Sequence, residues 1–311
     1  MEPILQIEHL SITFTQYSRG ARRRELPVIR DLSLSLSPGE VTAVVGASGS
    51  GKSLLAHAIL GLLPYNSRRE GSILYKGQEL TPRRLEKLRG REIALVPQGV
   101  TYLDPLMKVG PQLTQGRRDI DTRRRAQEAL SRYGLGPGTE RLYPFQLSGG
   151  MARRVLMASA VMESPQLIIA DEPTPGLDAQ AAGRLLGHFR ELAQEGAAVL
   201  FITHDLELAL TVAHRVAVFY AGETIEEALA SDFEAGSLRH PFTQALWDAL
   251  PQRGFRPIPG SQPYPGEVGE GCPFLGQCPH PGAGCAQGPL PLRPFQGGAV
   301  RCLYPNKEVA P

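Results

Sequence analysis

The chain has 311 residues, a formal net charge of +2, 42% hydrophobic residues and 21% charged residues. This composition is typical of a globular protein with a real core, and it gives no reason to expect a nucleic-acid or anionic-membrane partner. The N-terminus lacks the apolar run of a signal peptide, and no apolar run approaches the roughly 18 residues of a membrane span, so we expect a cytosolic protein.

Strands alternate with helices through the first 252 residues, beginning with the alternating pattern at Leu32–Leu36. Such alternation predicts an α/β fold with a mainly parallel sheet that is covered on both faces. The segment at about 99–165 has little strand character, and we predict a mainly helical insertion there. Buried strands are expected at Val41–Val45, Ile93–Val96, Leu167–Ala170, Ala198–Thr203 and Arg215–Tyr220, and helices at Lys52–Leu63, Thr122–Tyr133, Gly150–Met162, Ala179–Glu195 and Asp205–Ala213.

The sequence GASGSGKS follows the first buried strand and opens a helix, which is the context that a phosphate-binding P-loop requires. Its glycines let successive N–H groups point toward an anion, and the helix N-terminus adds partial positive charge. Lys52 is expected to reach the β- and γ-phosphates of a nucleotide, and the Ser53 hydroxyl to bind Mg²⁺. The predicted nucleotide-binding residues of this segment are Gly46, Ala47, Ser48, Gly49, Ser50, Gly51, Lys52, Ser53 and Leu54.

A second glycine-rich motif, LSGGM, places Ser148, Gly149 and Gly150 at the start of another predicted helix. Free N–H groups at a helix N-terminus form a phosphate-type site. One nucleotide needs only one P-loop, so this second site requires a separate explanation.

Two adjacent carboxylates follow the predicted strand in LIIADEP. In nucleotide-binding α/β sheets the chemistry takes place at the carboxyl ends of the strands. Asp171 is expected to hold Mg²⁺, directly or through water, and Glu172 to polarise the attacking water as a general base.

From Arg253 onward the composition changes, with 12 Pro and 11 Gly among 59 residues, so we place a domain boundary near Gln252. This extension contains all of the chain's cysteines. Disulfides do not suit a reducing cytosol, zinc usually takes closely spaced pairs, a [4Fe–4S] cluster tolerates varied spacing, and free thiols are the remaining alternative. The cysteines are Cys272, Cys278, Cys285 and Cys302.

Together these motifs resemble the ATP-binding subunits of ABC transporters over nearly the whole chain. The resemblance implies a P-loop NTPase core with a helical subdomain, in which LSGG reads the γ-phosphate of ATP held by an opposite subunit. It also implies that Gln98 touches Mg²⁺ and the attacking water, that His204 contacts the γ-phosphate, and that Asp178 lies at the dimer interface. Phe14 is our choice for the aromatic residue on adenine, with Tyr17 as the alternative.

Two motifs depart from the usual family pattern. The segment around Asp178 reads PGLD where the family usually has SALD, with Pro175 and Gly176 as the changed residues. After LSGGM, Ala152 and Arg153 stand where a basic residue and Gln are usual. Neither change removes a group expected to take part in hydrolysis.

The segment HPFTQALWDALP, His240–Pro251, closely resembles the HPYT segment of subunits from dipeptide, oligopeptide and nickel importers. It implies an ATP-hydrolysing subunit of a peptide importer, with nickel or another metal complex as the alternative cargo. The resemblance also favours a [4Fe–4S] cluster on the four cysteines, since the extension of such subunits can carry one and a cluster would hold together a segment without a core.

The partners implied by the resemblance are a related but different ATPase subunit, two membrane permeases and, indirectly, a substrate-binding protein. The expected location is peripheral, on the cytoplasmic face of the inner membrane, with no nucleic-acid partner. A non-transport ABC ATPase that acts on DNA or ribosomes is the alternative of another class. The single P-loop, the lack of sustained heptads and the HPFT segment argue against it.

Overall fold

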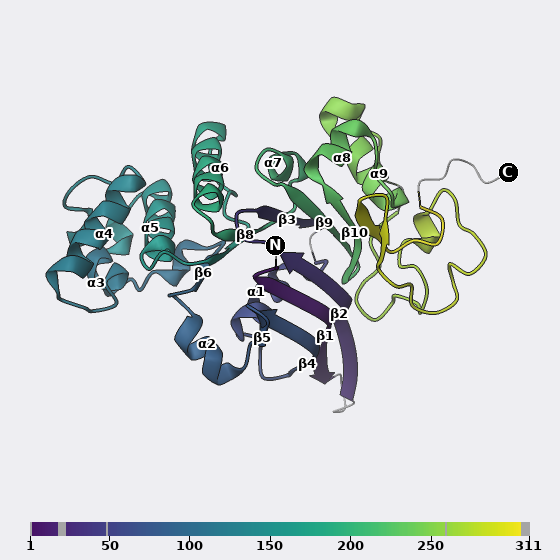
Figure 1. Cartoon of the computed structure of the whole chain (residues 1–311), viewed down its shortest axis with the longest axis horizontal. Helices are drawn as coiled ribbons and strands as arrows, with labels where there is room; N and C mark the ends of the chain where they lie inside the picture. The colour runs from purple at the N-terminus through teal and green to yellow at the C-terminus, as the bar shows by residue number, and fades with distance from the viewer. Residues whose placement is uncertain (1, 18–22, 48, 259, 306–311) are drawn as a thin grey trace.

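The central sheet of the protein has eight strands and a parallel core (Figure 1). The computed structural model describes residues 2–17, 23–47, 49–258 and 260–305. Parallel pairing joins β9 to β3, β3 to β8, β8 to β7 and β7 to β6, which confirms the predicted mainly parallel sheet. The strand order is β11 (Arg293–Phe295), β12 (Gly298–Val300), β10 (Glu223–Leu229), β9 (Arg215–Tyr220), β3 (Val41–Gly46), β8 (Ala198–Thr203), β7 (Leu167–Asp171) and β6 (Ile93–Val96).

A smaller antiparallel sheet lies beside the first, and the sequence pattern predicted only its strand at Leu32–Leu36. Between the two sheets lies an apolar core that includes Ile12, Ile29 and Ile73 from the small sheet and Val44 from the central one. The strand order is β2 (Arg23–Leu36), β1 (Leu5–Tyr17), β4 (Ser67–Tyr75) and β5 (Gln78–Glu79).

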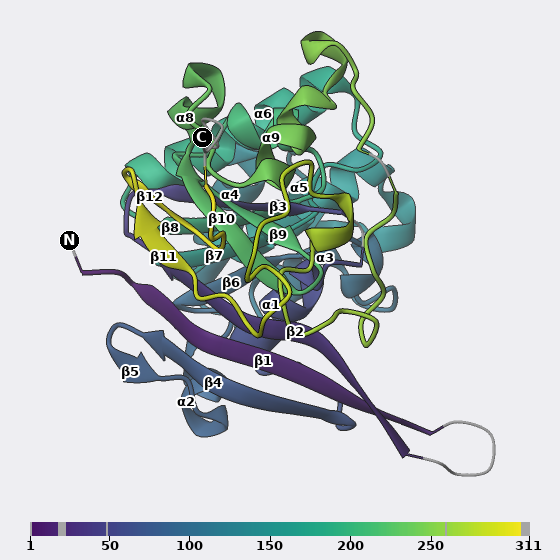
Figure 2. The same cartoon turned by 90° about the vertical axis from the view of Figure 1, so that its right-hand side faces the viewer.

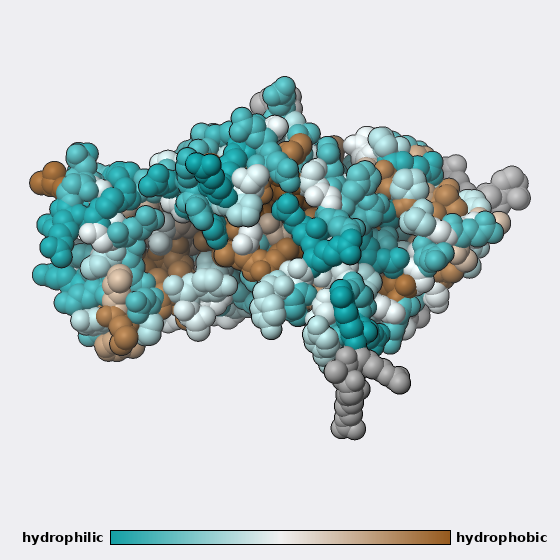
Figure 3. All heavy atoms as spheres, turned by 90° about the horizontal axis from the view of Figure 1, so that it is seen from below, coloured by the Kyte–Doolittle hydropathy of each residue, from teal (hydrophilic) through white to brown (hydrophobic). Residues whose placement is uncertain are grey.

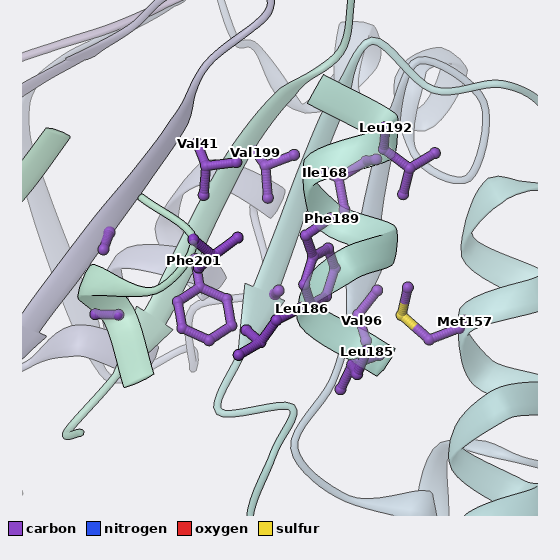
Figure 4. Packing of buried hydrophobic residues seen from close by; sticks show 14 of the residues in the cluster. Val41, Val96, Met157, Ile168, Leu185, Leu186, Phe189, Leu192, Val199 and Phe201 are labelled. Atoms are coloured by element: carbon purple, nitrogen blue, oxygen red, sulfur yellow. The ribbon is translucent and has the colours of Figure 1, made fainter. Parts of the chain in front are cut away.

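Helices complete the core on the other face of the central sheet. In Figure 4, Phe189 and Leu192 of α6 pack among Val199 and Phe201 of β8 and Ile168 of β7. Their spacing on α6 presents one apolar face, as an amphipathic helix on a sheet requires. The helices outside the helical subdomain are α1 (Lys52–Leu60) and α2 (Pro82–Leu88), which pack in the core between the two sheets, and α6 (Ala179–Gln194), α7 (Leu206–Leu210), α8 (Ala230–Ala235) and α9 (Pro241–Asp248).

The helical subdomain projects from one end of the central sheet, at the left of Figure 1. It follows β6 and ends before β7, where the sequence predicts a helical insertion. The two long helices expected there begin and end within about two residues of their predicted limits, as is usual for helix ends. The subdomain contains α3 (Val109–Leu113), α4 (Ile120–Arg132) and α5 (Gly149–Val161), with short 3-10 helices η1 (Val100–Tyr102), η2 (Thr139–Arg141) and η3 (Pro144–Gln146).

Several large apolar side chains are exposed in this subdomain. The face in Figure 3 is mainly hydrophilic, with hydrophobic residues in separate patches. No helix among the described residues is long and apolar enough to span a bilayer. The exposed residues of the subdomain and its entry segment are Val100, Tyr102, Leu106, Met107, Ile120 and Phe145.

The C-terminal extension shares the core of the rest of the protein. Strands β11 and β12 form a hairpin that adds to the edge of β10, with Glu226 opposite Val300, and Figure 2 shows it beside β10. Phe274 belongs to the main apolar cluster. The extension therefore packs into the apolar core formed by residues 1–252. The domain boundary near Gln252 remains a proposal. Two further 3-10 helices are η4 (Pro251–Arg253) and η5 (Leu275–Gln277).

Arg301, the residue after β12, anchors the extension. Its side chain is 2% exposed, and its guanidinium donates to the Asp31 carboxylate at 2.8 Å and to the Thr224 carbonyl at 3.0 Å. The Glu223 carboxylate lies 3.7 Å away. A buried arginine of this kind is tolerated only when its donors are satisfied, so the contacts fix the extension against β2 and β10.

Arg239 makes a second anchor of the same type. Its guanidinium contacts the fully buried Glu226 carboxylate at 3.3 Å and the Asp232 carboxylate at 2.9 Å. It also donates to the Phe295 carbonyl at 2.9 Å and to the Gln296 carbonyl. The β11–β12 hairpin is thus tied to the segment that precedes α9.

Candidate functional site

The P-loop runs from the end of β3 to the start of α1, as the sequence predicts. A Cβ on Gly46 would lie 2.3 Å from the Phe219 carbonyl oxygen of the neighbouring strand, so only glycine fits there. Gly51 precedes the helix with φ at +98°, a conformation that other residues rarely adopt. Ser48, also predicted to bind nucleotide, lies outside the described residues.

Lys52 lies across the P-loop. Its Nζ donates to the carbonyl oxygens of Gly46 at 2.8 Å and Ala47 at 2.9 Å. Burial lowers the pKa of the Lys52 amine, and the carboxylates of Glu172 and Asp171 oppose this effect. A buried cation that is held by two neutral carbonyls keeps its charge available for phosphate oxygens.

Ser53 and Asp171 form a pair of hard oxygen ligands. The Ser53 hydroxyl donates to Asp171 Oδ1 at 3.1 Å, which joins the first turn of α1 to the end of β7. Burial raises the pKa of the Asp171 carboxyl, and the Ser53 hydrogen bond opposes that rise. Gln98 lies exposed two residues beyond β6, whose last residue Val96 pairs with Ala170. The Ser53 hydroxyl, the Asp171 carboxylate and the Gln98 side-chain oxygen are the kinds of ligand that Mg²⁺ prefers, and Mg²⁺ also keeps several waters.

Glu172 and His204 are in contact beside this pair. His204 Nδ1 lies 3.1 Å from Glu172 Oε2, and the imidazole is the more exposed partner. Glu172 has φ at +42°, an unusual conformation for a residue with a side chain. Its N–H donates to the Ile202 carbonyl at 2.9 Å. Backbone strain of this kind costs about 1–3 kcal/mol and is found most often at functional sites.

The LSGG segment starts α5 and is open to solvent. Ser148 accepts a hydrogen bond from the Met151 N–H at 3.2 Å, and Ser148, Gly149 and Gly150 are all exposed. A Cβ placed on either glycine would meet nothing within 4 Å. Among the described residues, no hydrogen bond or ion pair joins this segment to the P-loop of its own chain. The LSGG segment can therefore accept a phosphate group from outside the chain.

The two segments that depart from the family pattern contact each other. Arg153 of α5 donates to the Pro173 carbonyl at 2.8 Å, and Gly176 lies beside its guanidinium. Asp178 caps α6 by accepting from the Ala181 N–H at 2.7 Å. The unusual arginine thus holds the segment that contains the unusual glycine, a contact that the sequence did not reveal.

Phe14 and Tyr17, the two candidates for adenine stacking, differ in exposure. Phe14 is half-buried and lies on the same face of β1 as Ile12, which pairs with Ile29 of β2. Ile29 is also the nearest neighbour of a Cβ placed on Gly51. Tyr17 lies at the far end of β1 and is 73% exposed. Phe14 is therefore nearer to the P-loop and stays our choice.

The four cysteines line one small pocket. Cys272, Cys278, Cys285 and Cys302 all contribute to it, together with His240. No disulfide joins any of them, and within the described residues no group of three or more His, Cys, Asp or Glu side chains is placed to hold a metal ion. Burial raises the pKa of the Cys272 thiol to about 11, and the other three cysteines add to the rise.

Comparison with known proteins gives consistent matches. Residues 29–175 match the ABC transporter family, and residues 225–285 match the oligopeptide/dipeptide transporter C-terminal region. The oligopeptide transport ATP-binding protein OppD of Escherichia coli (strain K12) is 34% identical, with 99% of this chain and 95% of that protein covered. The dipeptide transport ATP-binding protein DppD of Bacillus subtilis (strain 168) is 35% identical, with 90% and 88% covered.

Solved structures agree with the sequence comparisons. A dimeric ATP-binding cassette, MJ0796, in a post-hydrolysis state bound to ADP and phosphate, superposes with a TM-score of 0.62 at 27% identity. The match covers 73% of this chain and 98% of that one.

Proposed function

The chain belongs to the ATP-binding subunits of ABC transporters and is an ATPase coupled to transport, and we propose that it powers the import of dipeptides or oligopeptides through the residues described above. The single observation that carries the site proposal is the grouping of Lys52, Ser53, Asp171, Glu172 and His204 at one edge of the central sheet.

Each of these residues has a chemical task at the γ-phosphate. Lys52 binds the β- and γ-phosphate oxygens, and the N–H groups of the P-loop hold the remaining charge. Glu172 accepts a proton from the attacking water, and His204, in contact with Glu172, keeps the carboxylate oriented and reaches the γ-phosphate. Ser53, Asp171 and Gln98 would hold Mg²⁺, which would supply positive charge to balance the charge on the β- and γ-phosphates.

ATP is proposed to lie between this chain and a second ATPase subunit. Two observations support this arrangement: the exposed LSGG segment makes no hydrogen bond or ion pair with the P-loop of its own chain among the residues that the structure describes, and the similar cassette MJ0796 is a dimer. The partner is proposed to be a related but different chain, and Asp178 is proposed to lie at the interface.

A Ser148→Arg substitution tests the shared site. We expect ATP binding by the isolated chain to change by less than twofold, because no hydrogen bond joins Ser148 to the P-loop among the described residues. Turnover by the assembled transporter should fall at least about tenfold, because a long cation would block the approach of the opposite nucleotide to the helix N-terminus. Phosphate release and nucleotide titration measure the two quantities. Ser131→Arg, on an exposed position of α4, is the control, and normal turnover by the Ser148 variant would contradict the shared site.

The membrane permeases are proposed to dock beside Gln98 and the helical subdomain. The apolar side chains of Tyr102, Leu106 and Met107 are exposed directly after Gln98, with Leu106 at 86%. Exposed apolar side chains that gather in one segment are typical of an interaction surface. A change in the position of Gln98 would then be transmitted to the permeases through the short segment that follows it. The chain would lie on the cytoplasmic face of the membrane as a peripheral subunit.

The cysteine pocket is proposed to hold a [4Fe–4S] cluster. The four cysteines line one pocket, which supports a shared ligand. The raised pKa of Cys272 means that its thiol stays protonated unless a strong local cation is present. When bound, the cluster would join four points of the extension covalently.

Cys278→Ser tests this cluster. After anaerobic purification we expect iron and acid-labile sulfide in the original protein and loss of most of the visible absorption in the variant, because one of four thiolate ligands is gone. Cys278→Ser should leave ATP binding unchanged. Stoichiometric zinc without iron in the original protein would contradict the cluster.

A further inference from the structure

A tight turn in the C-terminal extension is held in one conformation. It spans Tyr264–Glu267, and the Glu267 N–H donates to the Tyr264 carbonyl at 2.9 Å. The Glu267 carboxylate also accepts from the Tyr264 N–H at 3.2 Å. The central residues are Pro265 and Gly266, and Gly266 has φ at +89°. This is the pattern of a type II turn, in which proline fixes the second residue and glycine suits the third.

The tip of this turn contacts β2. A Cβ placed on Gly266 would lie 3.3 Å from Arg24 Nη2 and 3.3 Å from Leu26 Cδ1. A second contact follows three residues later, where the Arg30 guanidinium donates to the Gly269 carbonyl at 3.0 Å. Figure 2 shows the extension beside β2. Arg24 and Leu26 are two residues apart on the strand, so they lie on the same face of the small sheet.

Phe14, our choice for the residue that stacks on adenine, shares this face. It is opposite Leu26 in the antiparallel pairing of β1 with β2. Side chains that are directly opposite each other lie on one face, with their Cβ atoms about 5 Å apart. Leu26 therefore has Phe14 as its neighbour across the strands and the turn of the extension beside its methyl group.

The same face of the two strands points toward the P-loop. Ile12, two residues before Phe14, pairs with Ile29 of β2. A Cβ placed on Gly51, the residue before α1, would lie 3.0 Å from Ile29 Cγ1. A nucleotide with its phosphates at the P-loop would extend its adenosine along this face toward Phe14. Gly266 is exposed despite its contacts with β2, so a ligand can reach the turn.

We propose that the Tyr264–Glu267 turn forms one side of the adenosine-binding site and holds Leu26 against Phe14. The inference rests on the proposed stacking of adenine on Phe14. A flat aromatic ring gains most when apolar groups fix the ring on which it stacks. Gly266 is a positioning residue that acts through Leu26, and its effect concerns the base and not the phosphates.

Gly266→Val and Gly288→Val are a matched pair of substitutions. Both glycines lie in the extension with positive φ, so valine imposes similar backbone strain at each. Valine at 266 must displace Leu26, whereas a Cβ on Gly288 meets nothing within 4 Å. For full-length Gly266→Val we expect the dissociation constant of ATP to rise about fivefold. That of inorganic tripolyphosphate, which has no adenosine, should change less than twofold, and Gly288→Val should change both by less than twofold.

Phe14→Ala shows whether the turn acts through the stacked base. It should weaken ATP binding about tenfold, a usual effect of losing a base–aromatic stack, and leave tripolyphosphate within twofold. Adding Gly266→Val should then cause little further loss, and a full further loss would contradict the action through Leu26. Unchanged ATP binding by Gly266→Val, or equal weakening of both ligands, would overturn the role of the turn and leave the stacking proposal standing. Unchanged ATP binding by Phe14→Ala would overturn both.

Hydrogen exchange in the original protein checks the turn without any substitution. With ATP bound, amide exchange in residues 261–270 should slow at least about threefold, because the adenosine would cover the turn. Tripolyphosphate at the same fractional occupancy should slow it less than twofold. Equal slowing by the two ligands, or none by ATP, would show that the turn is not part of the adenosine site.

Discussion

Replacing Glu172 with Gln is expected to reduce ATP turnover by about 10²–10⁴-fold, the usual contribution of a general base. The amide has the shape of the carboxylate and can still contact His204, but it cannot accept a proton from the attacking water. ATP binding should change little, because Lys52 and the P-loop remain intact. The assembled pair should therefore retain ATP after free nucleotide is removed. Phosphate release by the reconstituted transporter and retention of labelled ATP measure these two effects.

The control for this variant is Glu163→Gln. Glu163 forms ion pairs with Arg117 and Arg125 in the helical subdomain, away from the P-loop. The same loss of charge there should leave turnover within about twofold, since exposed ion pairs contribute about 0–1 kcal/mol. Phosphate release at the normal rate by Glu172→Gln would show that Glu172 is not the base. Loss of ATP binding would instead place Glu172 in the binding of nucleotide.

Local sequence was sufficient to predict the parallel core and to group the site residues. Strands such as β7 and β8 are continuous apolar runs, so their burial is evident from the residues themselves. The P-loop and the Asp171–Glu172 pair each lie within one short segment. Since the carboxyl ends of neighbouring parallel strands meet at one edge, Asp171, Glu172 and His204 could be expected together from the sequence alone.

Strand β10 could not be predicted in the same way. Its sequence, ETIEEAL, contains three glutamates, yet Glu223 and Glu226 are buried. Their charges are balanced by arginines that are distant in sequence, chiefly Arg301 for Glu223 and Arg239 for Glu226. A polar pattern predicts exposure unless the partners are known, and here the partners come from the segment before α9 and from the extension.

Partners that are distant in sequence also explain why the sequence predicted an extension without a core. Its proline and glycine content does exclude long helices, and no α-helix occurs among its described residues. Its apolar residues do not need a core of their own, however, because Phe274 enters the main cluster and contacts Tyr220 of β9. Phe219, the neighbour of Tyr220, lies against Gly46 of the P-loop. A short chain of contacts therefore joins the cysteine-bearing segment to the strand beside the P-loop, although the two are far apart in sequence.

Removing the anchor at Arg301 is expected to have the second large effect. Arg301→Met should lower the free energy of unfolding by about 3–5 kcal/mol, the usual cost of leaving a buried charge without its partner. Burial already raises the pKa of the Glu223 carboxyl, and Arg301 is the foremost of the groups that oppose the rise. Without the Arg301 guanidinium, Glu223 keeps only Arg30, whose Nε lies 3.7 Å from its Oε1, among the arginines that the structure places against it. Urea unfolding of preparations with equal metal content measures the loss.

Two further variants identify the cause of this loss. Arg293→Met removes a neighbouring but exposed arginine, which donates to the Cys302 carbonyl, and should cost about 0.5–1.5 kcal/mol. The double variant Arg301→Met/Glu223→Gln should be more stable than Arg301→Met alone, because it removes the stranded carboxylate. Together with Glu223→Gln alone, it completes a double-mutant cycle that gives the coupling between the two residues. Equal losses for Arg301→Met and Arg293→Met, with no recovery in the double variant, would contradict the anchor. Limited proteolysis should cleave the extension of Arg301→Met first, since that arginine joins it to β2 and β10.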